Sequence, residues 1–212
     1  MKMETAVRLG TLVVPFVLAA AGAWPAPPGG ADGVRIQNVT YGGSGCKRGT
    51  VAVDLAEDAR AFTILFSAFL AETGPFAPNG AAQSICDVHL TLDVPRGSTY
   101  AITAVDYRGF ARITTGERGR VGTRFQFPEA PRGTTWQTFA GPYNQDWRFR
   151  YEVDPTALDW SKCNVRRAVN LHTRLLIDGR PRDEGEGSLL TVDSQDGTVA
   201  QTYHLAWARC GT

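Results

Sequence analysis

Apolar residues occupy every second position in a series of short segments downstream of residue 33. Successive side chains of a β-strand point to opposite faces of a sheet, so each segment predicts a strand with one buried and one exposed face. Bounding Gly, Pro, Asn and Asp residues and the regular spacing indicate a sandwich of roughly a dozen strands rather than alternating strands and helices. Four clear examples are CDVHLTLDV (86–94), STYAITAVDY (98–107), DWRFRYEV (146–153) and AVNLHTRLLI (168–177).

One apolar segment carries mixed signals for helix and strand, and one turn has a clear sequence signature. Residues 55–74 (LAEDARAFTILFSAFLAETG) are rich in helix formers, but their large apolar residues recur at every second position. We therefore predict a strand over Ala61–Phe69. In residues 189–207, Asp196 and Gly197 separate two alternating segments, and an Asp-Gly pair supplies the positive φ angles of a tight hairpin turn.

The predicted fold class is all-β: a single antiparallel β-sandwich, jelly-roll-like, formed by residues 34–212 and containing two disulfides. The four cysteines are Cys46, Cys86, Cys163 and Cys210. They lack the close spacing of a zinc site, and an even number in an exported chain predicts two disulfides with three possible connectivities. We favour Cys46–Cys86 and Cys163–Cys210, which place one bridge in each half of the chain.

The N-terminal residues 1–23 have the order of a secretory signal peptide. Lys2 and Arg8 precede an apolar run over residues 9–21, and small residues follow. The run is shorter than the about 20 apolar residues that span a bilayer. Residues 24–33 form a Pro/Gly-rich leader. We expect a secreted, extracellular protein that has no membrane contact after signal cleavage.

The charge of the chain limits its partners. It carries 22 Lys and Arg against 21 Asp and Glu, a net charge of +1 at pH 7. Recognition of nucleic acid or of an anionic membrane surface relies on clustered basic residues, so we expect neither partner. The length suits one domain with its own core, and we expect a monomer.

A glycine-rich stretch, residues 40–50 (TYGGSGCKRGT), comes close to three functional motifs and matches none of them. Lys47 stands where a phosphate loop needs its second glycine, and Arg48 where a dinucleotide motif needs its last one. Cys46 stands where a nucleophile elbow needs its closing glycine. We therefore predict a tight turn held by a disulfide.

Residues that could support catalysis or metal binding are present but not arranged in a motif. The histidines His89, His172 and His204 lack metal-site spacing, so we predict no metal and no cofactor. His89 and His172 fall on polar strand faces, whereas the side that His204 takes is undefined. A glycosidase pair could come from any of seven carboxylates, but no carboxylate and no serine is distinguished. The seven are Asp87, Asp93, Asp106, Glu152, Asp154, Asp193 and Asp196.

Aromatic residues suggest binding more directly. Trp136, Trp147, Trp160 and Trp207 are many for one domain, and Tyr143 lies in the segment AGPYNQDW. Large aromatics mostly fill cores, but a flat ring beside polar groups also suits a sugar. We predict that Tyr143 and Trp147, next to a Gly-Pro turn, are ligand-binding residues rather than core residues.

An ordered set of segments carries a family resemblance. The segments are VTYGGSGCKRGTVAV, AETGPFAP, CDVHLTLDVPRGSTYAITAVDYRGFA, FAGPYNQDW, LDWSKCN and LLTVDSQDGTVAQTYHLAWARC. Over Val34–Cys210 the chain resembles domain of unknown function family 4360, secreted proteins of filamentous bacteria and fungi. The resemblance implies export and an all-β fold but no catalytic residue or ligand. VDYRG (105–109) and GPY (141–143) resemble family landmarks.

The favoured function is a non-enzymatic extracellular binding module, with carbohydrate or cell-wall polysaccharide as the partner. One alternative is a hydrolase of an extracellular polymer, which needs two carboxylates or a Ser-His pair converging in a concave pocket. The other is a cell-surface structural protein, which a large exposed apolar patch would favour.

Overall fold

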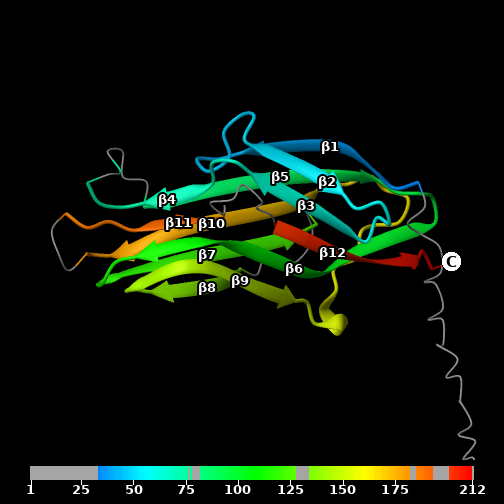
Figure 1. The fold of residues 1–212 in the computed structure, drawn as a ribbon. Helices are drawn as coiled ribbons and strands as arrows, with labels where there is room; N and C mark the ends of the chain where they lie inside the picture. Colours follow the sequence, from blue (N-terminus) through cyan, green and yellow to red (C-terminus); the bar gives the residue numbers. More distant parts are fainter. Residues whose placement is uncertain are drawn as a thin grey trace, which may run out of the picture.

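The computed structural model describes residues 33–75, 77, 82–127, 134–181, 185–192 and 201–211. These residues form two β-sheets and a short 3-10 helix (Pro155–Ala157), and Figure 1 shows the strands running along an elongated molecule. The strands are β1 (Arg35–Gly42), β2 (Val51–Leu55), β3 (Ala61–Phe66), β4 (Leu70–Glu72), β5 (Gln83–Asp93), β6 (Ser98–Ile113), β7 (Glu117–Gln126), β8 (Thr135–Ala140), β9 (Tyr143–Glu152), β10 (Val169–Gly179), β11 (Leu189–Thr191) and β12 (Gln201–Arg209).

Both sheets are antiparallel. The five-stranded sheet has the order β1-β5-β10-β7-β8, and the seven-stranded sheet has the order β2-β3-β12-β6-β11-β4, with β9 also paired to β6. The 16-residue strand β6 organises the larger sheet, because β12 and then β11 pair along one of its edges and β9 along the other. This arrangement confirms the predicted all-β, jelly-roll-like sandwich.

The hydrophobic core lies between the two sheets. On β5, Val88, Leu90 and Leu92 are buried while the residues between them are less buried, as the alternation predicts. Aromatic side chains join the sheets across the core: the rings of Phe125 on β7 and Tyr203 on β12 have centroids 6.1 Å apart. Burial of this apolar layer is the main stabilisation of the fold, and it leaves the outer face of each sheet free for polar side chains.

The strand predicted over Ala61–Phe69 is shorter than expected. β3 ends at Phe66, where the amide of Ser67 donates to the carbonyl oxygen of Thr50. The chain then bends, and Phe69 enters the core with its ring centroid 5.1 Å from that of Phe66. The bend has a packing cause, because a straight strand would not turn Phe69 toward the core.

Both disulfides pair as favoured, as Cys46–Cys86 and Cys163–Cys210. The first joins the glycine-rich stretch after β1 to β5. Gly43 has φ +131°, and a Cβ at this position would lie 2.2 Å from the carbonyl oxygen of Ile85, so the close approach requires glycine. The stretch is a tight structural turn, as predicted.

Some sequence predictions concern residues outside the described part of the chain. They are the hairpin turn at Asp196 and Gly197, the signal peptide over residues 1–23 and nearly all of the leader over residues 24–33. These stay predictions. No helix within the described residues is long and apolar enough to cross a bilayer.

Candidate functional site

The two residues predicted to bind a ligand both lie on β9, on the side that faces the core. Trp147 is only 4% exposed, and its ring packs against Phe139 and Phe149 with centroids 5.4 and 5.7 Å away. Tyr143 is half-buried, with its ring centroid 5.2 Å from that of Phe139. Trp147 therefore fills the core and has no ring face that a ligand could contact.

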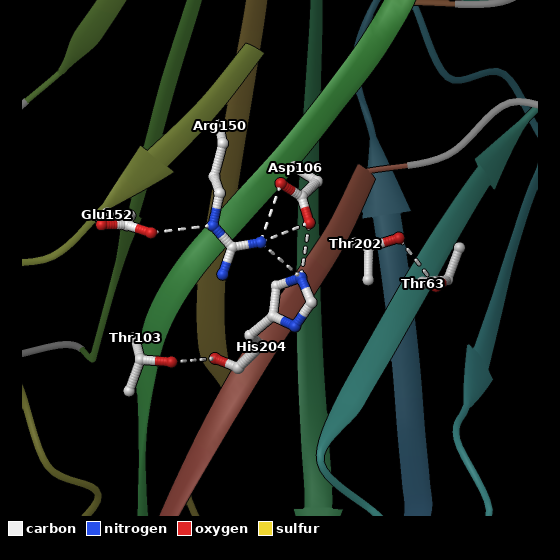
Figure 2. Close-up of polar contacts among 7 residues, drawn as sticks. All are labelled: Thr63, Thr103, Asp106, Arg150, Glu152, Thr202 and His204. Carbon is white, nitrogen blue, oxygen red and sulfur yellow. Dashed lines mark hydrogen bonds and ion pairs between the residues drawn. The ribbon is translucent and has the colours of Figure 1, made fainter. Parts of the chain in front are cut away.

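The outer face of the seven-stranded sheet gathers charged side chains from three adjacent strands. Asp106 of β6 lies directly opposite Arg150 of β9, and His204 of β12 lies diagonally across from Asp106. Figure 2 shows these three side chains pointing toward one another. Each follows an inward-facing residue by one position, so the period of two places all three on the outer face.

Asp106 is the shared acceptor of this cluster. Arg150 Nη1 donates to both carboxylate oxygens, at 3.1 and 2.8 Å, and His204 Nε2 lies 2.6 Å from Oδ2. Arg150 Nε also donates to Glu152 Oε1 at 3.1 Å. The hydrogen bonds with Glu152 and Asp106 raise the pKa of Arg150, so its guanidinium remains charged. The three side chains thus hold one another in fixed positions.

A β-bulge sets the position of His204. The register between β12 and β6 shifts directly after His204 and leaves Thr103 without a paired residue. Thr103 Oγ1 donates to the carbonyl oxygen of His204 at 3.3 Å. Because bulges re-aim neighbouring side chains, this irregularity contributes to bringing the imidazole onto Asp106.

The cluster borders an open pocket of about 570 Å³, which also has Arg108 and Arg148 in its lining. These two arginines lie directly opposite each other on β6 and β9. Like charges at directly opposed positions of a sheet are destabilising. In the described part of the chain neither guanidinium has a hydrogen-bond or ion-pair partner. Both therefore have their donors available to a ligand.

The segment VDYRG (105–109) contributes to the pocket on the outer face of the sheet and to the packing of the core on the inner face. Asp106 and Arg108 line the pocket on the outer face. Gly109 lies opposite Trp147, and a Cβ at this position would lie 2.5 Å from the Trp147 ring. The glycine leaves room for the indole in the core beneath the charged outer face.

The geometry does not resemble a hydrolase centre. The ring of His204 contacts Asp106 and Arg150, so within the described residues it holds no serine or threonine hydroxyl. Both oxygens of Asp106 accept hydrogen bonds from Arg150, and Glu152 pairs with the same arginine. A glycosidase needs two carboxyl groups that face the scissile bond. The described residues also contain no group of three or more His, Cys, Asp or Glu placed to hold a metal ion.

The outer face of the five-stranded sheet carries a second set of polar side chains. His89 and His172 lie on it, as predicted, and His172 Nδ1 is 2.6 Å from Asp87 Oδ1. Trp136 is 41% exposed on β8, with the guanidinium of Arg120 located 5.5 Å from its ring centroid. Asp87 and Arg120 on this face have protein partners, in contrast to the two arginines of the pocket.

The sequence predicted some features of the pocket around Asp106 but not its assembly. The alternation in DWRFRYEV separates Arg148 and Arg150 from Trp147, and Asp106 was one of several undistinguished carboxylates. The side taken by His204 was undefined. Period two assigns residues to faces but not strands to neighbours, so the convergence of β6, β9 and β12 had no signal in the sequence.

The fold and disulfides define a class, the disulfide-linked all-β domains of secreted proteins. The chain belongs to the family described as "Domain of unknown function (DUF4360)", whose model matches residues 32–210. It is 30% identical over 180 residues to an "Uncharacterized secreted protein" of Arthroderma benhamiae. The matched region covers 84% of this chain and 73% of that protein. With its two disulfides, the protein is a secreted member of this family.

Similarity to solved structures is weaker. TmCBM61 in complex with beta-1,4-galactotriose matches 82% of this chain and 90% of its own, at 7% identity and a TM-score of 0.30. The enzymatically active domain of bacteriophage CBA120 tailspike protein 4 matches 80% of this chain and 20% of its own, at 13% identity and a TM-score of 0.25. TM-scores this low carry no inference about what this chain binds.

Proposed function

We propose that this secreted protein is a non-enzymatic binding module for an extracellular polysaccharide, and that the pocket around Asp106 is its binding site. The observation that carries the proposal is the opposed pair Arg108 and Arg148, which border the pocket without a protein partner in the described part of the chain. Each guanidinium presents N–H donors in a rigid planar fork. Sugar hydroxyl and carboxylate oxygens are suitable acceptors for these donors.

The Asp106 cluster supplies the complementary acceptor. A carboxylate has about four lone-pair sites, and three hydrogen bonds from Arg150 and His204 leave one for a sugar hydroxyl. Thr202, also in the pocket lining, shares a 3.1 Å hydrogen bond with Thr63. Because these contacts fix the side chains before binding, a ligand loses less free energy to ordering them.

The proposal differs from the sequence prediction in its residues. Trp147 lies in the core and Tyr143 is half-buried beside Phe139, so neither carries the proposed site. Binding in the pocket would depend on charged hydrogen-bonding groups rather than on stacking against an aromatic ring.

A pull-down tests the proposal. The oxidised protein without residues 1–23 would be mixed with insoluble chitin, cellulose, β-glucan and peptidoglycan. We expect binding to at least one polymer, and a loss of affinity of about tenfold or more in the double variant Arg108→Gln, Arg148→Gln, because hydrogen bonds to charged groups contribute about 1.5–3 kcal/mol each. Arg118→Gln is the matched control, since Arg118 is exposed on the opposite sheet and likewise has no partner in the described residues.

Other outcomes would contradict the proposal. Release of reducing ends from a bound polymer would identify a hydrolase. Absence of binding to all four polymers would favour a cell-surface structural protein. Equal affinities of the double variant and the control, with unchanged thermal unfolding, would exclude the pocket as the binding site.

A further inference from the structure

A second pocket, of about 580 Å³, lies where β5 ends and β6 begins. The C-terminal end of β12 reaches this end of the sandwich, as the ribbon in Figure 1 shows. The lining of the pocket combines Leu92 of β5, the connection to β6, the first residues of β6 and residues of the segment 161–167 that precedes β10. It therefore lies in a different part of the fold from the pocket around Asp106.

The segment that forms one wall of this end pocket is held in place by contacts with both neighbouring strands. Cys163 is joined to Cys210 by the second disulfide, and the Cys210 amide donates to the carbonyl oxygen of Gly97 at 2.8 Å. Gly97 in turn donates its amide hydrogen to Asn164 Oδ1 at 3.0 Å. The wall is thus positioned before any ligand arrives.

The lining of the end pocket is rich in basic residues. Arg166 Nη2 lies 2.9 Å from Asp93 Oδ1, and Arg35 lies 3.2 Å from Asp93 Oδ2, so two arginines share this one carboxylate. No acidic side chain is among the described residues of the lining. The basic residues of the lining are Arg96, Lys162, Arg166 and Arg167, of which Lys162, Arg166 and Arg167 also interact with other residues of the protein.

One residue of the lining has a buried hydroxyl. Tyr100 lines the end pocket and is 2% exposed, with its ring centroid 5.4 Å from those of Phe127 and Trp207. Its hydroxyl is buried and has no hydrogen-bond partner among the described residues. A buried hydroxyl without a partner is destabilising, and an acceptor on a bound ligand would remove that cost.

We infer that the end pocket is a second binding site, which takes the carboxylate-bearing ring of an acidic sugar such as a uronic acid residue. The basic rim pairs with the carboxylate, and the Tyr100 hydroxyl donates to a ligand oxygen. Leu92 and Val94 in the lining provide apolar contact for the ring carbons. The inference goes beyond the proposed function and holds even if the pocket around Asp106 binds nothing.

Isothermal titration calorimetry tests the inference, with a short oligogalacturonate and the neutral galacto-oligosaccharide of the same length as ligands. We expect the acidic oligosaccharide to bind at least about tenfold more tightly, with affinity falling as salt rises. Arg96→Gln combined with Arg166→Gln should lower its affinity by about tenfold or more. Arg35→Gln is the matched control, because Arg35 also pairs with Asp93 but lies outside the lining.

Tyr100→Phe provides an independent test. It removes one oxygen that has no hydrogen-bond partner among the described residues, so the unfolding temperature should not fall, whereas oligogalacturonate affinity should fall about fivefold. The Arg108→Gln, Arg148→Gln variant should keep full affinity, which separates the two sites.

Three results would overturn the inference. The first is equal affinity for the acidic and neutral oligosaccharides. The second is an equal effect on affinity of Arg35→Gln and of the Arg96→Gln, Arg166→Gln variant. The third is inorganic phosphate binding as tightly as the oligogalacturonate, which would indicate a general anion site.

Discussion

Neighbouring residues of β9 have opposite roles. Trp147 is buried against Phe139, while Arg148 borders the pocket on the outer face. The cause is the strand geometry, which turns successive side chains to opposite faces of the sheet. Across the ladder, Gly109 leaves the space that the indole fills.

Replacing Trp147 therefore tests a core role against a binding role. We expect Trp147→Ala to lower the free energy of unfolding by about 3–5 kcal/mol, because it leaves a large cavity between the sheets. Trp136→Ala is the control, since Trp136 is 41% exposed and its loss should cost about 1 kcal/mol or less. Urea denaturation of both variants measures the difference. Equal costs would show that Trp147 is not a core residue.

At the scale of elements, regular strands and irregular connections are held by different interactions. Strands pair through continuous ladders, whereas the connection between β9 and β10 contains the short helix Pro155–Ala157 and an isolated bridge between Trp160 and Ala101. The connection is held to β6 by hydrogen bonds of Ser161 and to the end of β12 by the Cys163–Cys210 disulfide. These contacts position one wall of the end pocket.

Removing the two disulfides one at a time should separate stability from binding. The bridged cysteines are 47 and 40 residues apart, so loss of either bridge should lower the free energy of unfolding by about 4 kcal/mol in the loop-entropy model. Only Cys163→Ser with Cys210→Ser should also weaken oligogalacturonate binding. Denaturation and calorimetry on both double variants check this, and equal losses of binding would contradict the role of the second bridge.

At the scale of the whole molecule, closing two sheets over one core buries several tyrosines. Tyr100, Tyr107 and Tyr203 are all at most 2% exposed. Burial raises the pKa of each phenol above its ordinary value of 10.0. The folded state therefore keeps these protons at a pH where the unfolded chain releases them.

These raised pKa values make the free energy of unfolding depend on pH in the alkaline range. A pKa raised by folding contributes stability that is complete below the unfolded pKa and is lost as the pH rises toward the folded pKa. We expect the free energy of unfolding to fall above about pH 10, by about 1.4 kcal/mol per pH unit for each such tyrosine. Urea denaturation between about pH 8 and pH 11 measures it. The slope should be smaller in Tyr100→Phe, and a flat profile would contradict the account.

The sequence by itself determined which side of each strand is buried. Period two assigned Val88 and Leu90 to the core and His89 and His172 to the outer face, because the pleat is a local property of the chain. Four cysteines in an exported chain determined the number of disulfides, and the glycines of residues 40–50 indicated a tight turn.

Only the tertiary structure decided which polar faces meet and which aromatic residues are covered. Asp106, Arg150 and His204 are far apart in the sequence, and their convergence depends on β6 pairing with β9 on one edge and with β12 on the other. The same pairing lays β9 against Phe139 and buries Trp147. Strand order and register arise from long-range packing between the sheets, so the local pattern that defines each strand does not contain them.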